Sequence, residues 1–517
     1  MMTWLYMMCF AACIICTGLS VIREIHMLQL NSYQHVAHLR WIRTNIRKYG
    51  FHLVVFIAAL IAFVGHWSVY GILTAIFLGL ILLRLGKPHQ AKKPLVYTAR
   101  VKRILVTAAV LAGTLVWGII AAKPPMNYVL MGIFYSFSPL LIVLANLINA
   151  PVEKAVQNYY IRDAKKILKS CPNLTIIGIT GSYGKTSVKF YLHALLQAKY
   201  HALMTPESFN TPMGIVRTIR EDLRATHEVF VCEMGARYLH DIREICDIVR
   251  PHHGILTSLG PQHLETFGSM ENIIETKFEL IDSVPPQGMA FVNGDNELIR
   301  SHLPLKPYLT YGLGEGNHYR ACDISVTPKG TTFRVIGKNG EECDFETQLI
   351  GEHNVLNLVG AIACSNYLGI SLEALRMPVR KIVPVPHRLQ LIETETMTII
   401  DDSYNSNPVG CKEALKALAL FAGYKILVTP GMVELGPQHD ERHYEFGADA
   451  ATVCDFIVLV GEGRTRSIYK GLVESGFSPE RIYIAAGIKE AMDKVHSLPG
   501  AVGRKIVLLE NDLPDHY

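Results

Sequence analysis

The stretch GITGSYGKTS, residues 178–187, decides the fold of the larger part of this chain. The apolar run LTIIGIT (174–180), which overlaps its start, predicts a buried strand, and the amphipathic segment 185–199 predicts a helix. A strand, a glycine-rich turn and a helix in this order present backbone N–H groups to phosphate oxygens. Ile179 stands where the longer form G-x-x-x-x-G-K needs a glycine, so the match is to the tighter form T-G-x-x-G-K-T.

The side chains of this turn suit a magnesium nucleotide. A lysine after the second glycine can pair with phosphate charge, and the hydroxyl next to it can reach Mg²⁺. We therefore predict ATP and Mg²⁺ as cofactors. The residues of the turn that are predicted to bind the nucleotide are Gly181, Ser182, Gly184, Lys185, Thr186 and Ser187.

Short apolar runs go on alternating with amphipathic segments towards the C-terminus, which is typical of α/β sheets. Residues 319–349 alternate with a period of two and predict a small antiparallel insert, and the two prolines of IVPVPHRLQ mark a linker near residue 385. The predicted parallel strands are 228–234, 253–259 and 289–295 in the first unit and 425–431, 455–461, 481–486 and 505–510 in the second.

The first 150 residues have a different composition. Half of the whole chain is hydrophobic, and the excess lies in this part. A membrane-crossing helix needs about 20 apolar residues. Five spans are predicted, because the GHWSVYG turn divides 51–83 into two short helices; the segments are 2–22, 51–83, 104–122 and 127–148.

Basic residues set the predicted orientation. They gather in 23–48 and 84–103, and the short links at 67–70 and 123–126 hold only Lys123. The positive-inside rule then places both basic segments, and everything after residue 150, in the cytoplasm. The alternative, one tilted helix over 51–83, gives four spans and puts the nucleotide turn outside. No acidic residue falls inside the predicted spans.

The predicted fold class is an N-terminal α-helical membrane bundle followed by two α/β domains. The first is a P-loop-type doubly wound sheet, and the second is a smaller Rossmann-like C-terminal domain. The predicted boundaries are 1–150, 151–384 and 385–517. A net charge of +5 without a long basic run argues against nucleic acid as a partner, and the eleven cysteines are expected to be reduced thiols.

Polar side chains follow the predicted strands at the edge where such sheets bind ligands. Glu233 ends one strand, His263 follows the next, and Lys277 lies on the helix after that. Together with Thr186 they are predicted to hold the metal, and Lys185, His263 and Lys277 are the predicted catalytic residues. Any one of them alone would be unremarkable.

A second group is predicted to contact the nucleotide. Asn354 and Asn357 in GEHNVLN share a helix face, and amides suit an adenine edge; N-capping by Asn354 is an equally good interpretation. Arg388 in HRLQ is a candidate for the polyphosphate, and Asp402 closes the strand before an asparagine-rich turn.

The motifs TGSYGKTS, EMG, GEHNVLN, HRLQ, DDSYNSNP and GMVELG, with His263 and Lys277 between them, resemble the Mur ligases in content and order over residues 170–470. These enzymes form amide bonds with ATP in peptidoglycan synthesis. The last two motifs are most similar to the branch that adds D-alanyl-D-alanine to UDP-N-acetylmuramoyl-tripeptide. The resemblance implies that Lys277 is carbamylated and orients Mg²⁺, that Glu233 and His263 serve the metals, and that Asn354, Asn357, Arg388 and Asp402 hold ATP.

Two features depart from that family. Predicted membrane helices stand in place of the UDP-sugar domain, and the chain closes with the acidic VLLENDLPDHY instead of a lysine–glycine–serine segment. The expected function is a membrane-anchored ligase that joins an amine to a carboxylate-bearing cell-wall precursor. The alternatives are a poly-amino-acid ligase and a non-catalytic ATP-binding scaffold for wall-synthesis proteins. A transporter finds no support, since no second nucleotide motif is present.

Overall fold

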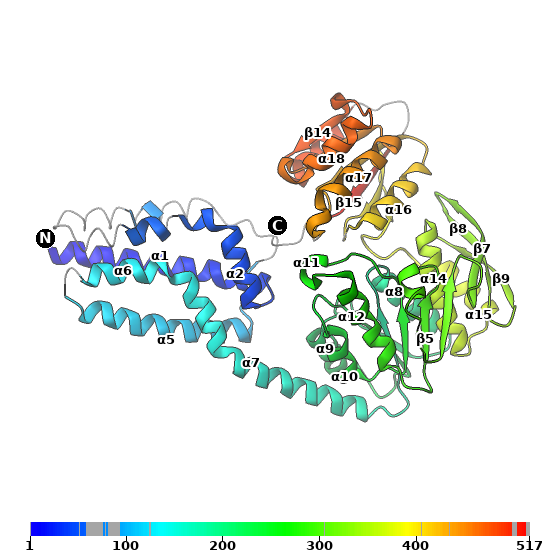
Figure 1. Ribbon diagram of the computed structural model, residues 1–517, viewed down its shortest axis with the longest axis horizontal. Helices are drawn as coiled ribbons and strands as arrows, with labels where there is room; N and C mark the ends of the chain where they lie inside the picture. Colours follow the sequence, from blue (N-terminus) through cyan, green and yellow to red (C-terminus); the bar gives the residue numbers. More distant parts are fainter. Residues whose placement is uncertain are drawn as a thin grey trace. The chain divides into compact units, whose positions relative to one another are not determined.

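The computed structural model divides the chain into two compact units, one formed by the N-terminal helices up to Tyr159 and the other by Tyr160–Leu513. Figure 1 shows their elements. The residues that the structure describes are 2–50, 52–57, 76–77, 79–80, 94–123, 126–303, 305–404, 406–433, 435–498 and 504–512.

The N-terminal unit is helical throughout its described part. Three of its helices are long and apolar enough to cross a membrane, over Tyr6–Leu30, Ala99–Ala121 and Ser138–Lys169. Many of their apolar side chains are exposed, among them Trp117 and Val110. The helices are α1 (Met2–Leu30), α2 (His35–Thr44), η1 (Ile46–Tyr49), α5 (Ala99–Ala121), α6 (Met126–Ser136) and α7 (Ser138–Lys169).

The predicted spans agree with this unit in part. The prediction 2–22 lies within α1 and 104–122 lies almost wholly within α5. The single helix over 127–148 is wrong, because α6 ends at Ser136 and α7 begins at Ser138. Pro139 follows directly; it has no N–H to continue a helix and suits the first turn of a new one. Most of 51–83 lies outside the described residues, so the number of five spans stays a prediction.

An acidic side chain does lie within a candidate span, contrary to the prediction. Helix α1 runs eight residues beyond the predicted end at residue 22, so that Glu24 falls inside it. Glu24 is fully buried, and the Tyr49 hydroxyl donates to both of its carboxylate oxygens at 2.9 Å.

The second unit begins with a nine-stranded sheet in the order β2-β3-β1-β4-β5-β6-β7-β8-β9. Neighbouring strands are parallel from β2 to β7 and antiparallel from β7 to β9, so the predicted insert extends the main sheet. The strands are β1 (Thr175–Thr180), β2 (Ala202–Met204), β3 (Val229–Glu233), β4 (His253–Leu256), β5 (Met289–Asn293), β6 (Tyr308–Gly312), β7 (Tyr319–Thr327), β8 (Gly330–Ile336) and β9 (Glu342–Thr347).

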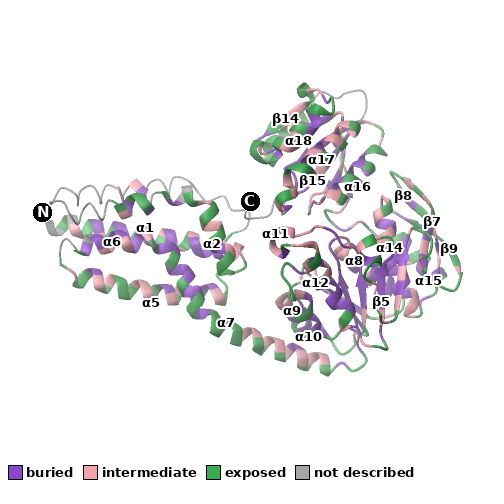
Figure 2. Cartoon of the chain, viewed as in Figure 1, coloured by how far each residue is buried: buried purple, intermediate pink, exposed green. Residues whose placement is uncertain are grey.

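Helices cover both faces of this sheet, and the buried residues form two cores between them (Figure 2). One core joins the sheet to α8 (Lys185–Leu196), α14 (Glu352–Tyr367) and α15 (Leu372–Lys381). The other joins it to α9 (Pro212–Glu221), α10 (Asp241–Val249) and α12 (Met270–Ser283). The short helices α11 (Leu264–Phe267) and α13 (Glu297–Arg300) lie in the connections. This is the doubly wound arrangement that the sequence predicts.

A smaller six-stranded sheet follows, in the order β10-β11-β15-β12-β13-β14, and only β10 is antiparallel. Because β11 pairs with β15, Asp402 lies in register with Glu510 at the carboxyl edge. The strands are β10 (Gln390–Glu393), β11 (Met397–Asp402), β12 (Tyr424–Thr429), β13 (Phe456–Val460), β14 (Ile482–Ala485) and β15 (Lys505–Glu510). The helices are α16 (Pro408–Ala419), η2 (Gly436–Gln438), α17 (His439–Val453), α18 (Glu462–Glu474), η3 (Pro479–Arg481) and α19 (Ile488–Ser497).

Candidate active site

The turn between β1 and α8 is built on two glycines with positive φ, a backbone conformation that other residues rarely adopt. Gly181 has a φ of 147° and Gly184 a φ of 81°. A Cβ on Gly181 would lie 2.1 Å from Thr257 Oγ1, and one on Gly184 would lie 2.4 Å from Asn357 Oδ1. The backbone of the turn therefore approaches neighbouring side chains too closely for a residue with a Cβ, at the N-terminus of α8 where anions are commonly bound.

Lys185 begins α8 and folds over this turn. Its Nζ donates to the carbonyl oxygens of Gly181 at 2.7 Å and of Ser182 at 3.0 Å. Burial lowers the pKa of Lys185 to about 8; the charge of Glu233 opposes this shift, and the charge of Arg388 adds to it. The lysine is half-buried. Its charge thus lies where phosphate oxygens would enter.

The two serines of the turn differ in environment. The Ser182 hydroxyl donates to the Gly260 carbonyl at 2.9 Å and accepts from the Gly260 N–H at 3.1 Å, so it fastens the turn to the loop after β4. Ser187 is buried in α8. Direct nucleotide binding by these two side chains stays a prediction.

Thr186 and Glu233 come together as the sequence predicts. The Thr186 hydroxyl donates to Glu233 Oε1 at 3.2 Å, and the Asn210 amide donates to the same oxygen at 3.0 Å. Neighbouring oxygen ligands in an octahedral Mg²⁺ shell of about 2.1 Å radius are about 3.0 Å apart. A hydroxyl and a carboxylate at this spacing fit a magnesium ion beside the phosphate turn.

Lys277 is buried on α12 with 2% of its surface exposed. Among the described residues its Nζ makes no hydrogen bond or ion pair, and the Phe267 ring lies 5.9 Å away. Burial lowers the pKa of Lys277 well below its ordinary value, and the charge of Lys185 adds to this effect. Carbamylation requires the unprotonated amine, which a lowered pKa favours, and this role of Lys277 stays a prediction.

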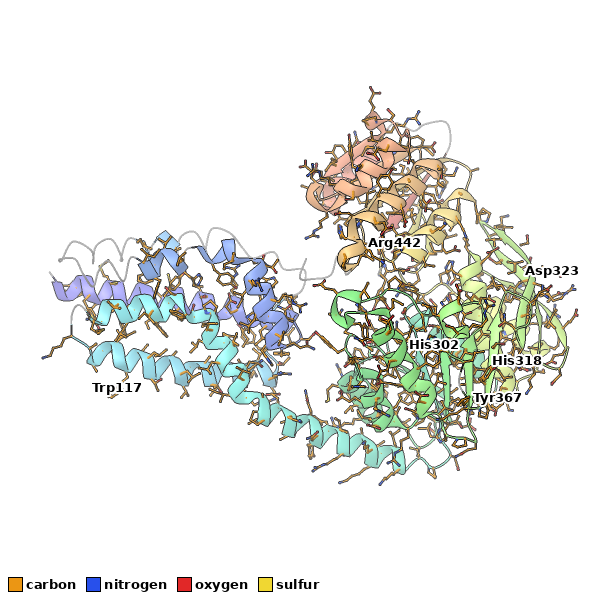
Figure 3. All side chains as sticks on the ribbon, viewed as in Figure 1. Trp117, His302, His318, Asp323, Tyr367 and Arg442 are labelled. Carbon is orange, nitrogen blue, oxygen red and sulfur yellow. The ribbon has the colours of Figure 1, made fainter. Side chains whose placement is uncertain are left out.

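His263 precedes α11 in a left-handed conformation, with a φ of 56°. It lines a small cavity between the two sheets of this unit, together with Pro261, Gln262, Ser406, Asn407, Val433 and Leu435. Burial raises the pKa of Tyr183, and the charge of Arg442 of α17, labelled in Figure 3, opposes this rise. Residues of both α/β domains therefore lie close to the phosphate turn and to His263.

Asn354 does not cap its helix, because the N-cap of α14 is Gly351. Its Oδ1 accepts from the Tyr191 hydroxyl at 2.8 Å, and its amide donates to the Ile350 carbonyl at 2.9 Å. N-capping is thus wrong, and the buried amide braces α14 against α8. Asn357 lies directly beside Gly184, at the phosphate turn. Contact of either amide with adenine stays a prediction.

Arg388 and Asp402 lie together in the C-terminal domain. The Arg388 guanidinium stacks on the Tyr404 ring at 4.5 Å. Asp402 accepts from the Leu389 N–H at 3.2 Å, and burial raises its pKa although Arg388 opposes this. The charge of Arg388 contributes to the pKa shifts of both Lys185 and Asp402, so it lies near residues of both α/β domains.

Three residues at these edges were not predicted. Lys189 contacts Glu233, and its position four residues after Lys185 on one helix face was a usable signal. Asn210 sits in a loop after β2 and gives no pattern in the sequence. Glu510 ends β15 and is fully buried; its Oε1 accepts from the Ser406 hydroxyl at 2.7 Å.

Comparison with known proteins agrees with this geometry. Residues 179–365 match the Mur ligase middle domain, and residues 387–509 match the Mur ligase glutamate ligase domain. The chain is 34% identical over 276 residues to the UDP-N-acetylmuramoyl-tripeptide–D-alanyl-D-alanine ligase of Bacillus subtilis, covering 53% of this chain and 59% of the relative. For the Escherichia coli enzyme of the same name the identity is 31% over 293 residues, covering 56% and 64%.

Solved structures of the same kind of ligase are also similar to this chain. The crystal structure of MurF ligase from Thermotoga maritima in complex with ADP superposes with a TM-score of 0.62 at 26% identity, over 70% of this chain and 81% of that one. The MurF structure from Acinetobacter baumannii also gives 0.62 at 26% identity, over 70% and 78%. The chain spans about three fifths of the length of the curated relatives it matches. The two domain matches cover more than half of its residues, and the chain belongs to the Mur ligase family.

Proposed function

We propose that this protein is a membrane-anchored, ATP-dependent ligase that joins an amino acid or D-alanyl-D-alanine to a cell-wall peptide precursor. One observation carries the proposal. The phosphate turn, the Thr186–Glu233 pair and the buried amine of Lys277 lie at the carboxyl edge of one sheet, opposite Arg388. A polyphosphate, a divalent ion and an acceptor carboxylate are the ligands that this set of charges fits.

The charged residues of the site stabilise different groups in the proposed reaction. A carboxylate is a poor electrophile, and transfer of the γ-phosphoryl group to it makes an acyl phosphate, which an amine attacks with loss of phosphate. Lys185 and Arg388 neutralise charge on the transferring group, which is most of what such a site must supply. Magnesium, held by Thr186 and Glu233 with His263, would add further positive charge there. The C-terminal domain excludes water from the acyl phosphate.

Lys277 is proposed to act as a carbamate. Its neutral nitrogen attacks CO₂: a C–N bond forms as one C=O π bond opens to an oxyanion, and the nitrogen passes one proton to water. The resulting anion supplies the oxygen ligands that an amine cannot. The burial of Lys277 and its lowered pKa support this role, because only the unprotonated amine reacts.

The N-terminal unit is proposed to span the membrane and to select the precursor. Its three candidate spans and their exposed apolar side chains support a bilayer location, with the ligase domains in the cytoplasm. The family matches begin at residue 179, and the described residues before β1 are mostly helical. A lipid-linked peptide precursor suits this arrangement better than a UDP-linked one.

The test is phosphate release by the full-length protein in lipid nanodiscs. Release should require ATP, Mg²⁺, a peptide precursor and an amine together, and the lipid-linked precursor should give the higher kcat/KM. Lys277→Ala should remove the activity while the protein stays folded, and bicarbonate with a short carboxylic acid should restore part of it.

Other outcomes point elsewhere. Phosphate release with repeated addition of one amino acid would favour a poly-amino-acid ligase. ATP binding without phosphate release for any precursor and amine would favour the scaffold, particularly if Lys185→Ala still complements a deletion strain.

A further inference from the structure

Lys189 lies one turn after Lys185 on α8, and its side chain is completely buried. Its Nζ is 3.0 Å from Glu233 Oε2, and it also donates to the Glu207 carbonyl. Nothing in the mechanism above uses this lysine. The position of this fully buried cation at a candidate metal site indicates that it has a function there.

The two oxygens of Glu233 have different environments. Oε1 accepts from Thr186 and Asn210 and faces the phosphate turn. Oε2 receives no hydrogen bond of good geometry, and the ammonium of Lys189 beside it supplies the opposite charge. A buried carboxylate without a partner is costly, so this contact fixes the rotation of the carboxylate.

The same lysine holds the loop that follows β2. Glu207 has a left-handed backbone, with a φ of 41°, and its carbonyl accepts from Lys189. Asn210 belongs to the same loop and donates to Glu233 Oε1. Lys189 therefore ties together the helix of the phosphate turn, the end of β3 and this loop.

We propose that Lys189 is the positioning residue of the metal site: it turns Glu233 so that only Oε1 reaches Mg²⁺, and its own charge keeps that ion weakly held. This inference rests on the proposed function. Glu233 then acts as a single-oxygen ligand, with Thr186 beside it. A cation beside one oxygen of a carboxylate would repel a divalent ion held by the other oxygen, so the lysine sets the magnesium affinity as well as the geometry.

The test uses Lys189→Gln, which removes the positive charge of the side chain and keeps a hydrogen-bond donor. In Lys189→Gln the Mg²⁺ concentration for half-maximal binding of ADP, measured by titration calorimetry on the full-length protein, should fall at least fivefold. Turnover at saturating Mg²⁺ should fall at least tenfold, because the carboxylate is no longer held in place. Lys199→Gln, at an exposed lysine of the same domain, is the matched control and should change neither value.

A lysine that serves packing alone would give another result. Loss of stability with an unchanged or raised Mg²⁺ requirement would overturn the proposal. If Lys189→Gln does not fold, Lys189→Met is combined with Glu233→Gln, which removes both charges. The double variant should melt close to the wild type; if it stays unfolded, the lysine does not act through Glu233 and the proposal fails.

Failure of the proposed function looks different from failure of this inference. A wild-type protein that does not bind Mg²⁺ and ADP at all contradicts the ligase. A wild type that binds both, with Lys189→Gln unchanged, contradicts only the role of Lys189.

Discussion

Replacing Lys277 by methionine should stabilise the ligase unit at neutral pH while it removes activity. Lys277 is buried with no hydrogen bond or ion pair among the described residues, and its pKa is lowered well below 10.5. The folded state therefore releases a proton that the unfolded chain keeps. Methionine has a similar shape and no charge to bury, and such a swap costs less than about 1.5 kcal/mol in packing.

The sign follows from proton linkage. Between the two pKa values the unfolded state binds one more proton at Lys277, so the stability of the wild type rises with pH by about 1.4 kcal/mol per unit. The destabilisation caused by Lys277 is complete below the pKa that this lysine has in the folded protein, and it disappears above 10.5. The free energy of unfolding of Lys277→Met should thus exceed that of the wild type most at pH 7, by at most about 5 kcal/mol. This difference should shrink towards pH 10.

The stability measurement needs a probe that lies in the unit Tyr160–Leu513. All four tryptophans lie in the first 117 residues, so their fluorescence does not report on the ligase domains. Hydrogen exchange of peptides from β1 and α12 in guanidinium chloride, at pH 7, 8 and 9 in CO₂-free buffer, measures the required free energies. Lys185 has a pKa of about 8 and contributes a slope to both proteins, so it cancels in the difference.

Two results would refute the reasoning. Parallel pH profiles would mean that Lys277 keeps its charge in the folded protein, and a less stable Lys277→Met would mean that its ammonium has a partner. Added bicarbonate provides a second test. It should stabilise the wild type by binding to the Lys277 amine of the folded protein, and it should leave the stability of Lys277→Met unchanged.

Three other outcomes are expected. Lys185→Ala should lower turnover a hundredfold or more, about 3–4 kcal/mol, in a phosphate-release assay, and it should keep the melting temperature within a few degrees. His353, followed by Lys416, lowers the pKa of Glu413 to about 2, so this carboxylate stabilises the unit above pH 4.5 and loses the effect as the pH falls towards 2; Glu413→Gln should lower the denaturation midpoint at pH 6 and not at pH 2. A reporter fused after residue 150 should be active only as a cytosolic tag, and activity on the outer side would contradict the predicted topology.

The strands and the proximity of Thr186 to Glu233 were predictable because their signals are local. The central runs 176–179 and 229–232 are apolar throughout, as is typical of strands buried on both faces. Polar residues at their carboxyl ends then meet at one edge. The N-capping alternative for Asn354 failed because the partners of this side chain, the Tyr191 hydroxyl and the Ile350 carbonyl, depend on how α14 packs on α8. Hydropathy across 127–148 likewise does not reveal the break before Pro139.

The charges at the edge of the nine-stranded sheet argue for an enzyme and against a scaffold. Three lysines surround Glu233, yet only Lys189 is within ion-pair distance of it. Lys185 and Lys277 both have lowered pKa values, which means that the folded protein is less stable for containing them. ATP alone would satisfy Lys185 in a scaffold, but it gives no reason for a buried amine at Lys277. An amine that must be neutral to react explains both the burial and the cost, because reactive groups need such environments.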